Sequence, residues 1–471
     1  MSKPLNRKTH DAGEAPSVRI VHLGLGAFHR AHQAWYTQRA GDGWGIASFT
    51  GRSPKAAEEL SSQDGLFTLV ERTADGDKFE IIDSIVEAHD GADLASLIDL
   101  LQRPEVGIVT LTVTEAGYRL KADGSGPDTD DEAVAADLAA LRAVSEELAA
   151  GTVPVTELAL QSVVARLVVG MSARRAAGAG PIAIVSCDNL PGNGAATRAA
   201  VLGTAELVDA QLAAWINDNV SFVDTSIDRI TPRTTDADRE AVLEATGFED
   251  ISPVVTEPFA SWVLQGEFPA GRPEWEKAGA VFVDDLDPFE RRKLWLLNGS
   301  HSLMAYAASL RGHQTVSEAL ADPVVDGWVE DFWDACAQHL VEEGLEVPAY
   351  REALRERFAN PRIAHHLAQI GMDGSLKLAA RALPVFELER AAGRSGVAAL
   401  RPVAAWMDKM VQQTTAGDEV QDPAADKIVE AAKVDGTKAQ TRALLAVIDA
   451  SLAKDDDVVS ELVELRGTFA N

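Results

Sequence analysis

Short apolar runs alternate with amphipathic stretches over the first half of the chain. β-Branched and apolar runs at residues 18–23, 106–114 and 182–186 predict buried strands. The stretches 93–101 and 131–150 have the spacing of amphipathic helices. Alternating strands and helices are typical of a doubly wound parallel sheet. The first half therefore predicts an α/β fold with a Rossmann-like sheet.

The pattern changes near Asp287. Beyond it β-branched runs become scarce, and alanine, leucine and charged residues repeat at helical spacing to the C-terminus. A chain of 471 residues is also long for a single core. We expect a Rossmann-like domain over residues 1–286 and a mostly α-helical domain over residues 287–471.

Glycines follow the first predicted strand. Residues 18–23 lead into Gly24-Leu25-Gly26, and a helix is expected from Ala31. Strand, Gly-x-Gly and helix, in that order, can place a dinucleotide pyrophosphate at a helix N-terminus. His29 stands where the third glycine of the motif is usual. An ordinary strand-to-helix turn is the alternative interpretation.

A second chemical candidate is the helix predicted from Asp287. With Lys293 at zero on an α-helix, Glu290 falls near about 60°, His301 near about 80° and Asn298 near about 140°. These groups, which can bind or transfer protons, thus share one side of one helix. The alternative is a solvated polar face.

The chemistry of that side suits an alcohol oxidation. A desolvated lysine such as Lys293 can become a general base near neutral pH. An amide and an imidazole beside it can hold an alcohol oxygen while it becomes a carbonyl. Gly299 argues against a merely solvated face, because a mid-helix glycine is costly without a packing reason.

Composition excludes several classes of function. The net charge of −30 argues against nucleic-acid binding and against anionic membrane surfaces. Cys187 and Cys336 are the two cysteines, and they predict neither a disulfide framework nor a cysteine metal site. The N-terminus lacks an apolar signal core, and no apolar run is long enough to span a bilayer. We expect a cytoplasmic protein.

Polar residues follow the strand predicted at 182–186. Cys187-Asp188-Asn189 and a glycine-rich turn come directly after it. Ligands bind at the carboxyl ends of strands in open parallel sheets. A plain turn is the alternative, because Pro-Gly and Asn-Gly are turn dipeptides.

Several motifs together resemble one family, the mannitol dehydrogenases, which are polyol-specific long-chain dehydrogenases. They occur in the same order over most of the chain: residues 21–32, Thr114-Glu115-Ala116-Gly117-Tyr118, Ser186-Cys187-Asp188-Asn189, Asp228-Arg229-Ile230-Thr231-Pro232, Glu257-Pro258-Phe259, Lys293-x4-Asn298-x2-His301, and Met372-Asp373-Gly374-Ser375-x-Lys377. In this family a histidine normally takes the place of the third glycine.

The resemblance implies catalytic roles. Lys293 is then the general base that takes the hydroxyl proton. Asn189 and Asn298 hold the reacting oxygen as negative charge develops on it. His301 orients a substrate hydroxyl, and Glu290 helps to relay the proton to solvent.

The resemblance also implies binding residues and a cofactor. Asp228 and Lys377 are expected to contact substrate hydroxyls, and Gln369 stands where some members have a substrate-binding arginine. The hydride goes to a nicotinamide, so no metal is expected. The cofactor-binding set is Gly24, Gly26, Ala27, Phe28, His29, Arg30, Arg52, Glu71 and Thr114.

Two residues bear on the choice between NAD and NADP. The segment 49–53, at the end of the second predicted strand, has no acid for the adenosine ribose, and Arg52 there favours a 2′-phosphate. Glu71 ends the next strand-like run, where NAD-preferring relatives carry an acid. A carboxylate would repel the phosphate, and Arg52 can stack on adenine instead. We predict NAD, with NADP as the alternative.

Three functions remain open at this stage. The first is interconversion of mannitol or a similar polyol with its ketose, by a protein expected to be a monomer. The second is reduction of a hexuronate, because residues 296–302 and 369–375 also resemble the fructuronate reductase branch. A carboxylate substrate would need a cation such as Lys377, Arg362 or Arg381. The third is a non-catalytic sugar or nucleotide sensor, against which the complete lysine, asparagine and histidine set argues.

Overall fold

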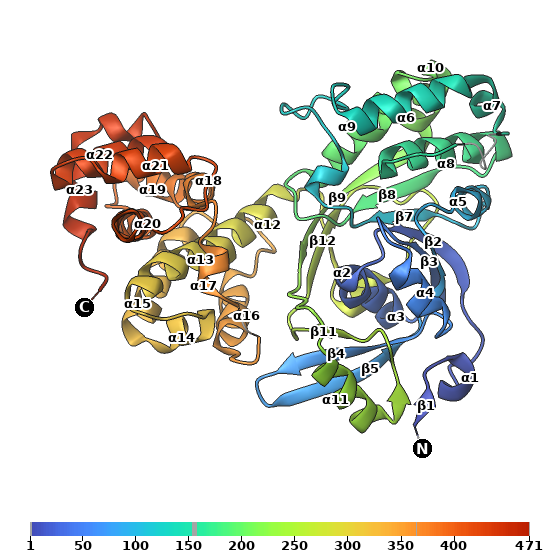
Figure 1. The fold of residues 1–471 in the computed structure, drawn as a ribbon, viewed down its shortest axis with the longest axis horizontal. Helices are drawn as coiled ribbons and strands as arrows, with labels where there is room; N and C mark the ends of the chain where they lie inside the picture. The colour runs from blue at the N-terminus through green and yellow to red at the C-terminus, as the bar shows by residue number, and fades with distance from the viewer. Residues whose placement is uncertain (1, 153–157, 364, 471) are drawn as a thin grey trace. The chain divides into compact units, whose positions relative to one another are not determined.

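The computed structural model describes residues 2–152, 158–363 and 365–470. The chain divides into two compact units, Met1–Leu286 and Asp287–Asn471 (Figure 1). None of the helices in the described ranges is long and apolar enough to cross a membrane.

The first unit is built on a large, mostly parallel sheet. Among the described residues it has eight strands in the order β13-β12-β9-β8-β7-β2-β3-β6. Their bounds are β2 Ser17–Leu23, β3 Trp44–Phe49, β6 Ile85–His89, β7 Ile108–Leu111, β8 Ile182–Ser186, β9 Val220–Asp228, β12 Ser261–Gln265 and β13 Val281–Phe282. In the part of the sheet ordered β9-β8-β7-β2-β3-β6, each strand is parallel to its neighbours. β12 runs antiparallel to β9. The predicted Rossmann-like fold is confirmed, with a mixed rather than wholly parallel sheet.

Helices cover both faces of this sheet (Figure 1). Ile20 and Val21 are adjacent on β2 and point to opposite faces, so they belong to different hydrophobic cores. Val21 packs in the core that includes Leu97 and Val168, and Ile20 in the core that includes Tyr36. The helices of this unit are α1 Arg7–His10, α2 Ala27–His29, η1 Arg30–Ala34, α3 Trp35–Ala40, α4 Lys55–Ser61, α5 Leu94–Leu101, η2 Glu115–Gly117, α6 Glu132–Ala143, α7 Ser145–Ala150, α8 Val163–Ala177, α9 Asn193–Glu206, α10 Ala210–Asn219, α11 Asp236–Thr246 and η3 Trp275–Ala278.

A hairpin leaves the main sheet after α4. It consists of β4 (Phe67–Thr73) and β5 (Gly76–Ile82), which pair antiparallel. β11 (Val254–Thr256) adds to β4 in parallel and completes a separate three-stranded sheet. The neighbour of β3 in the main sheet is therefore β6, and Glu71 lies on the separate sheet opposite Thr256.

The remaining small elements of this unit are two short strands. β1 (Lys3–Pro4) pairs in parallel with β10 (Phe248–Glu249), and they form a two-stranded sheet of their own. The N-terminal segment is thereby fastened to the residues that follow α11.

The second unit is mostly helical, as predicted. Its elements are α12 Asp287–Arg292, η4 Lys293–Gly299, α13 Ser300–Leu303, η5 Met304–Ala308, α14 Val316–Ala321, α15 Pro323–Ala337, α16 Val347–Ala359, α17 Leu367–Ile370, α18 Gly374–Arg381, α19 Leu383–Ala391, α20 Val397–Ala416, α21 Ala425–Ala432, α22 Thr437–Ile448, η6 Leu452–Lys454 and α23 Asp456–Leu465. Apolar side chains that include Leu296, Trp333, Leu400 and Trp406 are buried in this unit.

Candidate active site

The glycine turn connects β2 to the helical segment that begins at Ala27. Gly24 has φ +117°, and a Cβ on it would lie 2.1 Å from the Thr112 carbonyl oxygen, so only glycine fits. Gly26 is the N-cap of α2 and offers no side-chain cap to the first turn. A Cβ at Gly26 would meet only the Gly24 carbonyl, at 3.6 Å. Uncapped amides beside open space suit the phosphates of a dinucleotide.

His29 faces the interior of the unit. Its ring stacks on His22 with a centroid distance of 3.3 Å and an interplanar angle of 5°. Its Nε2 lies 3.1 Å from Ser48 Oγ, and its Nδ1 lies 3.3 Å from Gln33 Oε1. Burial is the main reason why the pKa of His29 is well below its usual range, and the nearby His22 lowers this pKa further. The histidine in the third-glycine position is therefore a neutral packing residue between helix and sheet.

Arg30 anchors the same turn from within. Its Nε donates to the Gly26 carbonyl at 3.2 Å, and its Nη1 donates to the Ser252 carbonyl at 2.5 Å. Burial lowers the pKa of this guanidinium to about 10. Ala27 and Phe28 are half-buried, and the Phe28 ring stacks on His32 at 5.1 Å. These contacts fix the backbone of the predicted cofactor turn.

Thr114, which follows strand β7, has a strained backbone conformation and is held by a residue that follows strand β8. Thr114 has φ 69° and ψ 158°, which is an unfavourable conformation for a β-branched residue. Asp188 holds it there: Oδ1 accepts the Thr114 backbone N–H at 2.8 Å, and Oδ2 accepts that of Val113 at 3.2 Å. The Tyr118 hydroxyl also donates to Asp188 Oδ2, at 2.6 Å. Strain fixed by several bonds at strand ends is typical of a functional site.

Further bonds fix the turn that carries Asn189. Asn193 Nδ2 donates to the Asp188 carbonyl at 2.9 Å and to the Thr225 carbonyl at 2.7 Å. Burial raises the pKa of the Asp188 carboxyl, opposed by the hydrogen bond from Tyr118. Asn189 is the next residue along the chain. Asp188, Asn193 and Tyr118 are not among the predicted site residues, although Tyr118 ends the motif at 114–118 and Asp188 lies in the motif at 186–189.

Asp228 ends β9 and precedes a buried arginine. Arg229 Nη1 donates to the Ala31 carbonyl at 2.6 Å, and its Nε donates to the Glu257 carbonyl at 3.2 Å. Glu71 Oε2 lies 3.6 Å from Arg229 Nη2. The structure therefore joins three of the sequence motifs within the first unit, and Glu71 belongs to this cluster.

In the second unit, Lys293 begins a π-helical segment. α12 is continuous with η4, which spans Lys293–Gly299 and contains Asn298. The expectation of α-helical geometry, with Lys293 and Asn298 about 140° apart, is wrong here. In a π-helix the backbone bonds join residues five apart, so Lys293 and Asn298 lie on successive turns. π-Helical turns are frequent at functional sites.

Contacts from α15 explain this geometry. The Leu296 carbonyl accepts the Trp333 indole N–H at 2.8 Å and also the Ser300 hydroxyl. Such side-chain donors compete with the regular helical bonds of that carbonyl. A Cβ on Gly299 would lie 2.5 Å from the Phe332 ring, so this mid-helix glycine permits a close approach.

His301 is buried one helical turn beyond Asn298. Its ring meets His365 edge-on at 4.8 Å and packs against Phe358 at 4.9 Å. Burial is the main cause that keeps its pKa well below the usual range, followed by the nearby His365, Arg357 and Arg381. Its Nε2 is buried and has no hydrogen-bond partner within the described ranges. A neutral imidazole with an unsatisfied nitrogen is suited to bind a hydroxyl.

Arg381 lies beside Asn298. Its Nη1 donates to the Asn298 carbonyl at 3.3 Å and to Ser302 Oγ at 3.1 Å. Burial lowers the pKa of this arginine to about 10. In the part of the chain that the structure describes, Arg381 has no acidic partner.

The structure also places the other residues of this unit that were predicted to belong to the site. Lys377 Nζ donates to the Ile370 carbonyl at 3.2 Å, and burial lowers the pKa of this lysine. Gln369 is exposed on α17. Glu290 is half-buried in the last turn of α12, before Lys293.

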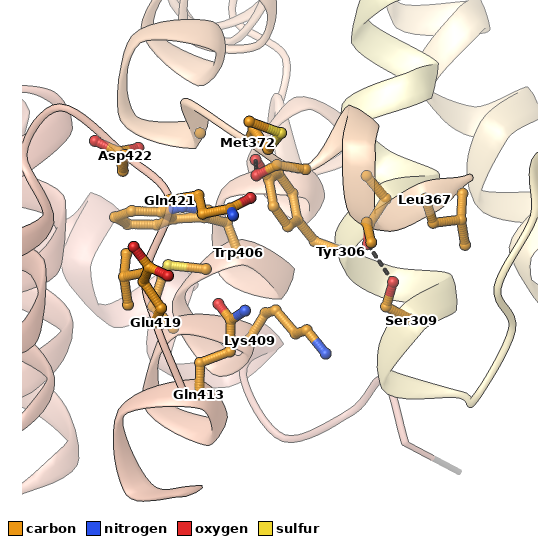
Figure 2. A pocket seen from close by; sticks show the side chains of 16 residues that line it. Tyr306, Ser309, Leu367, Met372, Trp406, Lys409, Gln413, Glu419, Gln421 and Asp422 are labelled. Carbon is orange, nitrogen blue, oxygen red and sulfur yellow. Dashed lines mark hydrogen bonds between the residues drawn. The ribbon is translucent and has the colours of Figure 1, made fainter. Parts of the chain in front are cut away.

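This unit also contains a cavity of about 310 Å³. Figure 2 shows side chains that line it. Tyr306, Trp406 and Lys409 line it, and none of the residues predicted to be catalytic does. The Tyr306 hydroxyl donates to the Gly371 carbonyl at 3.0 Å, whereas the buried Trp406 Nε1 has no partner within the described ranges. Tyr306 belongs to η5, the later part of the same helical run that carries Lys293, so this run lines the cavity without its predicted catalytic residues.

Comparison with known proteins identifies the family. The model of the mannitol dehydrogenase Rossmann domain matches residues 18–277, and that of the mannitol dehydrogenase C-terminal domain matches residues 285–466. The chain belongs to the mannitol dehydrogenase family. It is therefore a member of an oxidoreductase family, as the motifs suggest. Of the described residues, no three His, Cys, Asp or Glu side chains are gathered as metal ligands would be.

Relatives in this family include enzymes with different substrates. The chain is 36% identical over 415 residues to D-mannonate oxidoreductase of Escherichia coli K12, covering 86% of this chain and 82% of the relative. It is 36% identical over 385 residues to mannitol 2-dehydrogenase of Cereibacter sphaeroides, covering 80% and 77%. The solved mannitol 2-dehydrogenase of Pseudomonas fluorescens, in ternary complex with NAD and D-mannitol, is 33% identical with a TM-score of 0.74, covering 99% of this chain and 96% of that one.

Proposed function

We propose that the protein is an NAD-dependent dehydrogenase that interconverts a polyol, mannitol or a similar one, with its 2-ketose. The observation that carries this proposal is the π-helical segment with Lys293 and Asn298 on successive turns, followed by the buried, neutral His301. A sensor has no need of a proton acceptor in such a place. The solved Pseudomonas fluorescens relative, which holds NAD and D-mannitol, supports the same substrate class.

The first unit offers a cradle that fits a dinucleotide. Gly24 allows the close backbone approach to Thr112, and the first turn after Gly26 has amides without a side-chain cap. Backbone amides at a helix start bind phosphate oxygens. The bound nicotinamide supplies the hydride acceptor in oxidation and the hydride donor in reduction.

In oxidation, Lys293 Nζ takes the proton of the substrate hydroxyl. The amides of Asn298 and Asn189 donate to the same oxygen, whose negative charge grows as its carbon loses the hydride. His301 Nε2 holds a second hydroxyl and thereby orients the reacting carbon. Glu290, one turn before Lys293, passes the proton on to solvent.

Asp228 and Lys377 bind the remaining substrate hydroxyls in this proposal. A carboxylate accepts hydrogen bonds from hydroxyl groups, and an ammonium donates to them. Gln369 is exposed on α17, and its amide can add a neutral contact.

The nicotinamide absorbance tests this function directly. We expect turnover with mannitol, arabinitol or sorbitol in oxidation and with fructose in reduction. The purified protein should be compared with the Lys293→Ala variant as a blank. Absence of turnover with every polyol and ketose, while the cofactor still binds, would contradict the proposal.

A second candidate function is reduction of a hexuronate. The half-buried Arg381 beside Asn298 favours it, because among the described residues this cation has no acidic partner and can take a carboxylate. The similarity to D-mannonate oxidoreductase points the same way. Fructuronate and fructose, compared at equal concentration, separate the two functions. If the protein is a hexuronate reductase, Arg381→Met should raise KM for fructuronate far more than KM for fructose.

A further inference from the structure

The first unit contains an open cavity of about 970 Å³ next to the glycine turn. Leu25 from that turn lines it, together with residues that follow β3 and residues at the start of α11. The residues on which the argument depends are Leu25, Thr50, Arg52, Lys55, Arg233 and Arg239.

The position of this cavity matches one end of a dinucleotide. β2 and β3 are parallel neighbours, and Leu23 pairs with Phe49 at their carboxyl ends. Leu25 and Thr50 follow these ends directly and both line the cavity. In dinucleotide-binding sheets the adenosine ribose lies at the end of the second strand. The cavity is therefore the place for the adenosine ribose.

The charge of the cavity is positive although the whole chain has a net charge of −30. Its lining has four basic residues, Arg52, Lys55, Arg233 and Arg239, and two acidic ones, Glu59 and Asp236.

Each acid is already engaged with a base. Glu59 lies 3.6 Å from Lys55, and Asp236 lies 2.5 Å from Arg239. Arg52 and Arg233 are exposed, and neither has an acidic partner in the described part of the chain. Two guanidinium groups are thus available to an anion.

Glu71 does not offset this charge. It is not among the residues that line the cavity. Its Oε1 lies 3.3 Å from Lys78 Nζ, and its Oε2 lies 3.6 Å from Arg229 Nη2. The carboxylate that was expected to repel a 2′-phosphate therefore belongs to the separate sheet of the hairpin.

We propose that this cavity binds the 2′-phosphate of adenosine, with Arg52 and Arg233 as its ligands, so that the protein accepts NADP as well as NAD. Guanidinium groups bind phosphate oxygens through paired, charge-assisted hydrogen bonds. An arginine near the ribose is the usual means of accommodating this phosphate. The inference rests on the proposed function for its biological use, but the binding site itself is tested separately.

The test is calorimetric titration of the full chain with 2′,5′-ADP and with 5′-AMP, which differ only in the 2′-phosphate. We expect 2′,5′-ADP to bind at least about tenfold more tightly, as charge-assisted hydrogen bonds imply. Arg52→Gln and Arg233→Gln should each reduce this preference, and the double variant should abolish it. Excess NAD should displace both nucleotides.

Arg198→Gln is the matched control. This arginine is on α9, where it bonds Asn217, and it is not part of the cavity lining. The preference should be unchanged in that variant. Equal binding of the two nucleotides, or a preference that survives the double substitution, would overturn the site.

The outcome for the site is independent of the proposed function. If 2′,5′-ADP binds preferentially but no polyol or ketose is turned over, the site stands and the proposed function fails. If polyols are oxidised with NAD while the two nucleotides bind equally, the function stands and the site is refuted.

Discussion

The Asp188 carboxylate accepts the backbone N–H of Thr114 at 2.8 Å and so holds a β-branched residue at φ 69°. The two residues are 74 positions apart and lie at the ends of the neighbouring strands β7 and β8. Such a conformation costs about 1–3 kcal/mol and persists only where surrounding bonds enforce it. The bonds to Val113 and Tyr118 show that Asp188 organises the whole turn. Asn189, a proposed oxyanion ligand, follows this organising residue directly.

Asp188→Ala should therefore cost less stability in the presence of Thr114 than in a Thr114→Gly background. Without the carboxylate, the N–H groups of Val113 and Thr114 lose their acceptor, and the expected loss is about 1–3 kcal/mol. With Thr114 present, release of its strain offsets part of this loss. In a Thr114→Gly background there is no strain to release, so the same substitution should cost more. Denaturant unfolding of the four proteins measures the coupling. Equal costs in both backgrounds would show that Asp188 does not hold a strained residue.

Lys293→Ala should lower kcat by about 100- to 10,000-fold, as loss of a general base usually does. Cofactor affinity should stay unchanged, because the predicted dinucleotide cradle is built from the Gly24 turn. Single-turnover absorbance and titration with NAD measure the two effects. Lys409→Ala, which alters the separate cavity of the second unit, is the control and should keep normal turnover. Near-normal kcat in the Lys293 variant would reject the base.

Local sequence patterns account for much of the fold. Three such patterns involve only residues that are close to one another in sequence. They are the apolar run before Gly24, the β-branched run at 182–186 and the loss of such runs after Asp287. The strand β2, the strand β8 and the helical second unit follow from them. The glycine turn and the Lys293 helix could be identified as candidate sites for the same reason.

Contacts that are distant in sequence account for what the patterns could not predict. Next to the π-helical turn at Lys293, Trp333 of α15 donates to the Leu296 carbonyl, and Phe332 of α15 lies close to Gly299. The position of Glu71 depends on β11, which pairs with β4 and draws the hairpin into its own sheet. No periodicity within a segment encodes such partners.

The pH dependence of stability should report on buried histidines. Burial lowers the pKa of His22 from 6.5 to about 3. Below about pH 6.5 the unfolded chain takes up a proton at this position and the folded chain does not, so stability falls as pH falls towards about 3. The slope from one such group is at most about 1.4 kcal/mol per pH unit.

Unfolding of His22→Asn at about pH 7.5 and about pH 5 tests this dependence. The variant should lose less stability between the two pH values than the natural protein, whatever its stability at the higher one. His10, which is on the short helix α1 and is not buried, is the control position. A drop of the same size in His22→Asn would show that His22 does not titrate as proposed.

Gly299→Ala should destabilise the second unit although alanine is the better helix former. The helix preference alone would favour the substitution by about 1 kcal/mol. The new Cβ would, however, lie 2.5 Å from Phe332 Cε1 and 3.4 Å from the Arg381 carbonyl oxygen. Overpacking of this kind usually costs about 1–3 kcal/mol, and here the helix must also shift next to Asn298. We therefore expect lower stability together with reduced kcat.

Two further variants identify the cause. Phe332→Leu should restore part of the stability lost in Gly299→Ala, because it removes the ring edge that the Cβ meets. Gly327→Ala, on α15 with no atom within 4 Å of the added carbon, should be neutral or stabilising. Thermal unfolding and kcat are measured for all four proteins. If Gly299→Ala behaved like Gly327→Ala, the close contact with Phe332 would not constrain the helix that carries Lys293 and Asn298. The bonds to the Leu296 carbonyl would then be the remaining explanation of the π-helical geometry.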